Sequence, residues 1–161
     1  MSLKLQHPFT LIVDGPSSLG KSTFVIRLLE HKEQLCDIVF KNIVWCHSED
    51  NAPHQLKDVS FVKGVPDFEN PENVPTLIVL DDLMESAYSK KLSELFSKGS
   101  HHRNSLVLIT QNMFHQGRSS SDISLNSKYI VVFKNPRVKT QICILLGRST
   151  LKTLVVFTRR T

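Results

Sequence analysis

A glycine-rich segment near the start of the chain has the residue types needed to hold a phosphate group. Residues 15–22 match the pattern G-x-x-x-x-G-K-[ST] at every fixed position. The glycines allow the backbone to curl so that several N–H groups point at the same phosphate oxygens. Lys21 can reach the β- and γ-phosphates of a nucleotide, and the Ser22 hydroxyl can bind Mg²⁺. The predicted phosphate site comprises consecutive residues, the last as a weaker contact: Gly15, Pro16, Ser17, Ser18, Leu19, Gly20, Lys21, Ser22 and Thr23.

Two adjacent carboxylates follow the most apolar run of the sequence. Residues 76–80 read TLIVL, and Asp81 and Asp82 come directly after them. A nucleotide hydrolase needs a carboxylate near its metal ion, at the end of a strand close to the phosphate loop. We expect Asp81 to hold Mg²⁺ through its water shell, and Asp82 to orient the attacking water and help to deprotonate it. The alternative is a solvated strand end or a helix N-cap.

An amide and an arginine flank the next apolar run, residues 106–109. Gln111 follows this run, and an amide at the carboxyl end of a strand beside the phosphate loop can sense the γ-phosphate or position water. Arg103 precedes the run and can stabilise transition-state charge on the nucleotide of a neighbouring subunit. Both residues also fit plain structural roles, Gln111 as a polar residue in a turn and Arg103 as an ordinary surface arginine.

These residues need a scaffold of buried strands joined by helices. Short apolar runs predict strands at 9–13, 43–46, 76–80, 106–109 and 129–133, with a weaker candidate at 59–62. Apolar residues at helical spacing predict one helix from Lys21 and a second across 88–96 that ends near Gly99. Strands that are apolar on both faces, with helices between them, predict an α/β fold. Its mainly parallel sheet would be flanked by helices on both faces.

The chain of 161 residues fits one domain, residues 1–161. Residues 114–126 predict a polar loop, and the apolar runs at 142–146 and 154–157 have no assigned place. No run approaches the roughly 18 apolar residues of a membrane span, and the first residues do not resemble a signal peptide. The three cysteines form no CxxC pair, which predicts free thiols in a reducing, intracellular compartment.

Basic residues are concentrated in the last quarter of the chain. Residues 1–122 hold 12 Lys/Arg and all 15 Asp/Glu, whereas residues 123–161 hold eight Lys/Arg and no acid. A one-sided basic segment can contact the phosphates of a nucleic acid, or it can be a solvated edge or tail. The eight residues are Lys128, Lys134, Arg137, Lys139, Arg148, Lys152, Arg159 and Arg160.

Four segments, taken in order, resemble one protein family. They are residues 15–23, 77–84 (LIVLDDLM), 99–112 (GSHHRNSLVLITQN) and 123–136 (ISLNSKYIVVFKNP). Together they resemble the genome-packaging ATPases of large DNA viruses and of Maverick/Polinton-like virus-derived elements. These are the poxvirus-type packaging ATPases within the FtsK/HerA superfamily. The likeness covers roughly residues 8–146, and the three later segments are specific when they occur together.

The resemblance implies a P-loop NTPase fold of the RecA/FtsK-HerA kind, with ATP and Mg²⁺ as ligands. By family pattern, Asp81 and Asp82 would be the Walker B pair, and Gln111 the polar residue of the strand after it. Arg103 would be an arginine finger that acts in trans. The family also implies a homo-oligomeric ring that moves duplex DNA, with the basic C-terminal part on the DNA and a capsid protein as a further candidate partner.

The sequence departs from the family pattern in two places. Most P-loop hydrolases of this type carry Glu where Asp82 stands, and Asp is a shorter substitute. Family members also continue past residues 129–133 with helical sequence, whereas 147–161 does not look like that continuation and suggests an altered or truncated end. Two other functions stay open: a small-molecule kinase, with Arg118 in its lid, and a non-catalytic nucleotide-binding remnant of a virus-derived element.

Overall fold

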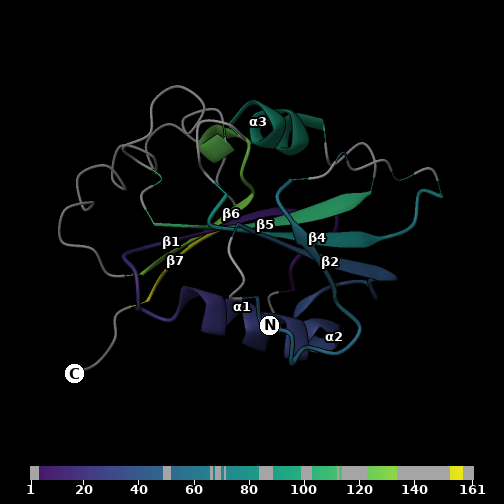
Figure 1. The fold of residues 1–161 in the computed structure, drawn as a ribbon, viewed down its shortest axis with the longest axis horizontal. Coiled ribbons are helices and arrows are strands. Elements are labelled where there is room, and N and C mark those ends of the chain that lie inside the picture. Colours follow the sequence, from purple (N-terminus) through teal and green to yellow (C-terminus); the bar gives the residue numbers. More distant parts are fainter. Residues whose placement is uncertain are drawn as a thin grey trace.

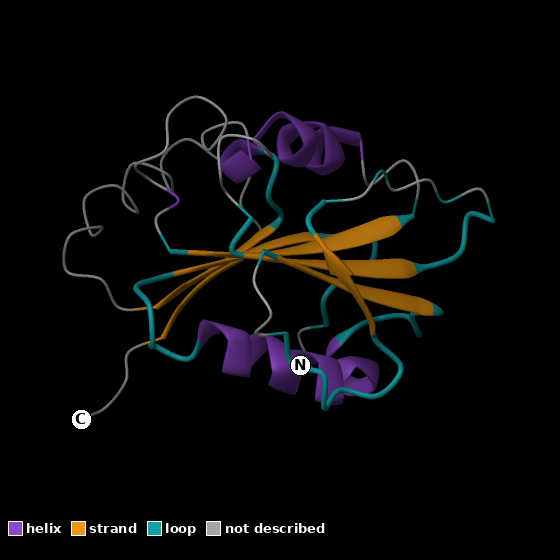
Figure 2. Cartoon of the chain, viewed as in Figure 1, coloured by secondary structure: helices purple, strands orange, loops and turns teal. Residues whose placement is uncertain are grey.

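A seven-stranded sheet forms the middle layer of the computed structural model (Figures 1 and 2). The structure describes residues 4–48, 52–65, 67, 70, 72–83, 89–98, 103–111, 113 and 123–133, together with the backbone of 153–157. The strands are β1 (Thr10–Asp14), β2 (Asn42–His47), β3 (Ser60–Lys63), β4 (Thr76–Asp81), β5 (Asn104–Thr110), β6 (Tyr129–Phe133) and β7 (Thr153–Phe157). They lie in the order β3-β2-β4-β5-β1-β6-β7, and each neighbouring pair runs parallel. All strands therefore begin at one edge of the sheet, the amino edge, and end at the other, the carboxyl edge.

Helices cover both faces of this sheet. α1 (Lys21–Glu30) and the short α2 (Lys32–Leu35) lie on one face, and α3 (Ser89–Lys98) lies on the other (Figure 1). Parallel strands need long crossover connections, and helices in those connections bury the two faces of the sheet. The predicted α/β architecture, a mainly parallel sheet flanked by helices on both faces, is confirmed.

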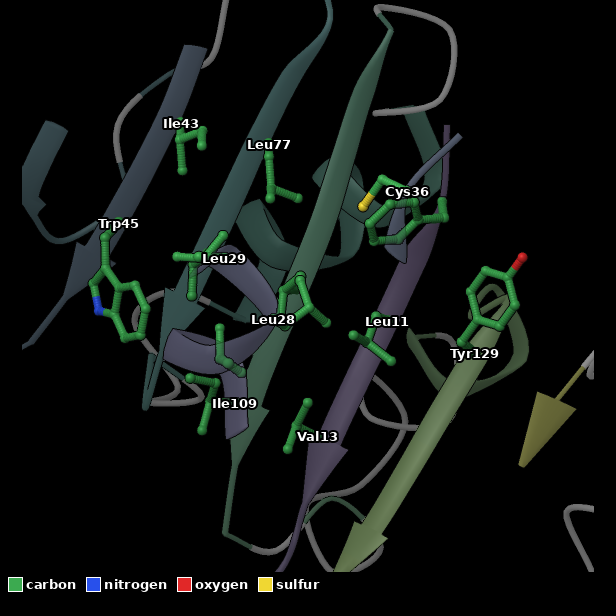
Figure 3. Close-up of a cluster of buried hydrophobic side chains, with 14 of the residues drawn as sticks. Leu11, Val13, Leu28, Leu29, Cys36, Ile43, Trp45, Leu77, Ile109 and Tyr129 are labelled. Atoms are coloured by element: carbon green, nitrogen blue, oxygen red, sulfur yellow. The ribbon is translucent and has the colours of Figure 1, made fainter. Parts of the chain in front are cut away.

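Successive residues of each strand point to opposite faces and fill two separate cores. On the α1 face, Leu11 of β1 belongs to the same buried cluster as Leu28 of α1 and Trp45 of β2 (Figure 3). On the α3 face, Ile12 of β1 belongs to a second cluster with Leu92 of α3. Because both sides of each central strand are buried, the strands read in sequence as unbroken apolar runs rather than as alternating patterns.

The position of β5 decides which side chains meet at the carboxyl edge. β5 lies between β1 and β4, so that Asp14 is in register with Thr110 and Asp81 with Ile109. The phosphate loop follows β1, the acidic pair ends β4, and Gln111 follows β5. The expectation that the strand before Gln111 lies beside the phosphate-loop strand is confirmed, and the predicted site residues from the three strands meet at one edge.

Two segments differ from the prediction. The apolar run at 154–157, which had no assigned place, lies in β7 and pairs with β6. Residues 123–125, predicted as part of a polar loop, form a helical turn in which Ile123 is fully buried in the α3-face core. The prediction was wrong because the residues around Ile123 are polar, and one apolar residue among them does not form a recognisable helical pattern. The apolar run at 142–146 lies outside the described residues.

The prediction of free thiols is confirmed for two of the three cysteines. Cys36 and Cys46 are free and buried, and burial raises the pKa of their thiols to about 11 and about 12 respectively. These thiols are therefore protonated and unreactive near neutral pH. Cys143 lies outside the described residues.

Candidate functional site

The phosphate loop runs from the carboxyl end of β1 into the first turn of α1. Gly20 is the N-cap of α1 and adopts φ 90°, a left-handed conformation that glycine reaches without strain. Because Gly20 has no side chain to cap the helix, the first N–H groups of α1 are left for another acceptor, and the helix dipole favours an anion there. Gly15 packs tightly against β6, since a Cβ at this position would lie 2.7 Å from the Cβ of Phe133. The geometry thus requires glycine at both ends of the loop.

Lys21 is buried at the first position of α1, where its side chain bonds to the loop itself. Its Nζ donates to the carbonyl oxygen of Gly15 at 2.6 Å and to that of Pro16 at 2.8 Å. Burial lowers the pKa of Lys21, and three nearby carboxylates, of which Asp14 has the largest effect, oppose that shift. The ammonium is held by weak carbonyl acceptors inside the curl of the loop, and phosphate oxygens would replace them as stronger, charged partners.

Asp14 is a site residue that the sequence analysis missed. The strand predicted at residues 9–13 stops before it, whereas in the structure Asp14 is the last residue of β1 and is almost fully buried. One carboxylate oxygen accepts a hydrogen bond from the backbone N–H of Met113 at 3.1 Å, which ties the end of β1 to the segment after β5. A charged residue placed directly between an apolar strand and the first loop glycine was the signal available in the sequence.

The acidic pair splits into two different environments. Asp81, the last residue of β4, is half-buried, and burial raises the pKa of its carboxyl; the Trp45 indole is the largest influence that opposes this shift. Asp82 is exposed, and it turns the chain away from the sheet with φ 53°. Its backbone N–H donates to the carbonyl of Ile109 at 3.1 Å, which holds the turn against β5. The pair therefore offers one sheltered and one solvent-facing carboxylate, as the two predicted roles require.

Gln111 connects the phosphate loop to the acidic pair. Its Oε1 accepts a hydrogen bond from the Ser17 hydroxyl at 2.9 Å. Its Nε2 donates to Oδ2 of Asp82 at 3.4 Å, a longer contact. Three side chains predicted from three separate segments of sequence thus form one chain of hydrogen bonds across the carboxyl edge.

A cleft of about 470 Å³ opens over these residues. Its lining includes Lys21 and Ser22 from α1, both members of the acidic pair, and Gln111. The opposite wall comes from the loop after β2, through Ser48, Ala52, Pro53 and Gln55. The sequence analysis assigned no function to this stretch, because no residue type in it indicates a nucleotide site. Five of the predicted cofactor contacts are not among the residues that line the cleft, namely Gly15, Pro16, Leu19, Gly20 and Thr23.

Arg103 lies away from the cleft. It directly precedes β5, at the amino edge, and the length of β5 separates it from Gln111 by roughly 26 Å at about 3.3 Å per residue. It is exposed, adopts φ 54°, and its carbonyl accepts the N–H of Thr76 at 3.3 Å. Arg103 therefore cannot touch a nucleotide in this cleft of its own chain, and its role on a neighbouring subunit stays a prediction.

The basic C-terminal quarter is described at only one of its charged side chains. Lys128 Nζ donates to the carbonyls of Gln6 at 3.0 Å and Pro8 at 3.5 Å, so it fastens the N-terminal segment to the amino edge. The other seven basic residues lie outside the described side chains. In the described part of the chain, no helix is both long and apolar enough to cross a membrane.

Comparison with known proteins supports the fold and goes no further. Neither a protein-family model nor a curated protein sequence matched the chain. Among solved structures, "The cytoplasmic domain of EssC" has a similar fold, with a TM-score of 0.59, 12% sequence identity and 96% of this chain covered. This chain spans 38% of the length of that one. Together with the loop geometry and strand order, the likeness confirms the predicted P-loop NTPase fold.

Proposed function

We propose that the chain binds ATP together with Mg²⁺ and hydrolyses it. The observation that carries the proposal is the hydrogen-bonded chain in which Gln111 joins Ser17 of the phosphate loop to Asp82. An amide and an exposed carboxylate, held side by side next to the phosphate loop, can both contact one small molecule. Water is the acceptor that such a pair suits, because the amide orients it and the carboxylate takes its proton.

Mg²⁺ fits the oxygen ligands at this edge. The ion prefers carboxylate, hydroxyl and water oxygens, and it is usually held by one or two carboxylates together with substrate phosphates. Ser22 and Asp81 supply a hydroxyl and a carboxylate from two different elements, and both line the cleft. When bound, Mg²⁺ would neutralise charge on the β- and γ-phosphates.

Each side chain then has a defined task in hydrolysis. Lys21 leaves its two loop carbonyls and places its ammonium on the β- and γ-phosphate oxygens. Gln111 orients the water, and Asp82 accepts its proton as the water oxygen bonds to the γ-phosphorus. The bond from that phosphorus to the bridging oxygen breaks, and ADP and inorganic phosphate are released.

We further propose that hydrolysis drives movement along duplex DNA. The support is the ordered set of motifs that resembles the viral and Maverick/Polinton-type packaging ATPases, together with the acid-free basic segment 123–161. In a ring of identical chains, Arg103 at the amino edge would reach the nucleotide of the next subunit. Basic side chains along DNA phosphates would give sequence-independent binding that weakens as salt is added. A capsid protein would be the partner of a packaging motor.

Phosphate release with and without duplex DNA tests the proposal. ATP turnover that duplex DNA stimulates, in an oligomeric sample, is the expected result. Lys21→Ala should abolish turnover because the phosphate loop loses its cation, whereas Lys41→Ala at the amino edge should leave it unchanged. Transfer of phosphate to a nucleoside or another small acceptor would instead indicate a kinase. A strict monomer without turnover would indicate the nucleotide-binding remnant.

A further inference from the structure

Trp45 carries a buried hydrogen-bond donor that has no partner among the residues that the structure describes. It is the only tryptophan of the chain, its side chain is fully buried, and it lies in the α1-face core (Figure 3). Its indole Nε1 is shielded from solvent and makes no hydrogen bond within the part of the chain that the structure describes. An unmade hydrogen bond at a buried donor costs about 1–3 kcal/mol, so a core position needing only bulk would favour phenylalanine or leucine.

The strand register places this donor beside the predicted metal-binding carboxylate. β2 and β4 are neighbours, with Trp45 opposite Val79 and His47 opposite Asp81. Because side chains alternate along a strand, Trp45 and Asp81 project from the same face of the sheet, two register positions apart along the strand direction. In Figure 3 the indole ring extends from β2 toward the carboxyl ends of the strands. Other polar groups also act on Asp81, among them Lys21, which can only donate, and His47, which stands opposite Asp81 on β2. The indole N–H bonds to neither of them in the part of the chain that the structure describes.

We propose that Trp45 is a positioning residue for the metal site, whose indole N–H donates to the Asp81 carboxylate when Mg²⁺ and nucleotide fix that carboxylate. This inference rests on the proposed function. It adds a hydrogen-bond donor, the indole N–H, that would fix the orientation of the Asp81 carboxylate. The indole lies close enough to the Asp81 side chain to act on it, although its N–H forms no hydrogen bond within the described part of the chain. A small rotation of the carboxylate on binding the metal would complete the bond.

The consequence for metal binding follows from the environment of Asp81. Asp81 is half-buried at the end of β4, and a carboxylate presents one oxygen to a metal site better when a hydrogen bond holds its second oxygen. Groups behind the ligands typically change metal affinity by about 10–100-fold. Loss of the indole N–H should therefore weaken Mg²⁺ binding in the ADP complex about 10-fold, while ADP affinity in the presence of EDTA stays the same.

The single tryptophan makes a direct test feasible. In ¹⁵N-labelled protein the chain gives one indole N–H resonance, which should shift when Mg²⁺ is added to the ADP complex. In Asp81→Ala protein, the Mg²⁺-dependent shift should be lost. In Asp82→Asn protein the response to Mg²⁺ should persist, because that carboxylate lies on the exposed turn. The readout is spectroscopic and does not depend on turnover.

Replacing the indole N–H by sulfur isolates the hydrogen bond from packing. A tryptophan auxotroph fed benzothienylalanine exchanges N–H for S at position 45 alone and keeps the ring shape. The Mg²⁺ affinity of the ADP complex, measured by calorimetry, should fall about 10-fold. Ile43→Val trims the same buried layer without removing a donor and should leave that affinity unchanged. Unaltered Mg²⁺ affinity, or an indole resonance unmoved by Mg²⁺ while ADP binds, would overturn this inference alone. Failure of the unmodified protein to bind ADP would overturn the proposed function as well.

Discussion

Both edges of the parallel sheet are polar, but their polar groups are engaged in different ways. At the amino edge, the hydroxyl of Ser105 accepts the N–H of Phe9 at 3.1 Å and lies 2.7 Å from Nδ1 of His7. Asn70 likewise donates to the side-chain oxygen of Asn104 at 3.2 Å. Ser105 and Asn104 are buried, and they bond to other parts of the same chain. The amino edge uses its polar groups to close the fold.

At the carboxyl edge, several of the polar groups are exposed or bond to neutral acceptors of their own loop. Gln111 reaches Asp82 at 3.4 Å, both residues are exposed, and Lys21 donates only to carbonyls of its own loop. An open cleft lies over them. The difference shows that a polar residue at the end of a strand is not by itself evidence of a binding or catalytic site. Groups that line an open cleft and bond to neutral acceptors can exchange their partners for a ligand, whereas groups such as Ser105, enclosed between segments of the chain, cannot.

Replacement of a carboxylate by an amide should give the largest difference in ATP turnover between the two edges. Asp82→Asn should lower the turnover of ATP by about 10²–10⁴-fold, because Asn cannot take the proton of water. Asp58→Asn is the matched control, since Asp58 is also exposed and left-handed, with φ 60°, but lines a groove at the amino edge. Phosphate release should be normal in that variant. Equal turnover in Asp82→Asn and the wild-type protein would remove Asp82 from the mechanism.

Loss of the connecting amide should separate rate from stability. Gln111→Ala should reduce turnover by about 10²-fold, as removal of one preorganised hydrogen-bonding group at a reacting centre does. The free energy of unfolding should change by less than about 0.5 kcal/mol, because Gln111 is exposed. Phosphate release and urea unfolding measure the two quantities on one sample. A variant that loses stability but keeps its turnover would show that Gln111 stabilises the fold and takes no part in hydrolysis.

The reverse result is expected from the amino edge. Ser105→Ala leaves the N–H of Phe9 and the ring of His7 without their hydroxyl partner, in a position with no exposure to solvent. The free energy of unfolding should fall by about 1–3 kcal/mol. Turnover per folded molecule should stay at the wild-type value. A drop in turnover at unchanged stability would contradict the structural role of this edge.

The same contrast explains what the sequence could predict. The strands and the helix at Lys21 were predictable because apolar runs and glycines dictate local structure. Gln111 was predictable because parallel strands carry their last residues to one edge. Asp14 was missed because an acid next to a glycine also reads as a plain turn, and only burial reveals it.

The wall formed by Ser48, Pro53 and their neighbours was missed for another reason. No residue in that loop has a chemistry that marks a site, and its position depends on the turn after β2. Residues 123–125 are likewise anchored by tertiary packing, because Ile123 is buried in the α3-face core. A single apolar residue in a polar stretch is too weak a signal to predict that packing. Most of the features that could not be predicted from the sequence therefore depend on contacts between distant segments of the chain.

The smallest expected effect is a pH dependence that differs between the two edges. Burial lowers the pKa of His7, and Arg103 and Lys128 lower it further, whereas Asp37 raises it. The unfolded chain therefore binds a proton more readily than the folded one, so stability is lost as the pH falls below about 6.5, until it passes the folded pKa. Asp81 has the opposite sign, because its raised pKa makes the folded state take up a proton before the unfolded chain does.

Urea unfolding at about pH 7.5 and about pH 5.5 isolates the contribution of His7. The wild-type protein should lose more stability between these values than His7→Gln, whose amide keeps a polar partner for Ser105 without a titrating ring. His31→Gln, which removes an exposed histidine next to α2, should retain the wild-type loss. If His7→Gln retains it too, protonation at the amino edge does not oppose folding. The buried bonds of that edge would then tolerate a charge, and the contrast with the carboxyl edge would rest on geometry alone.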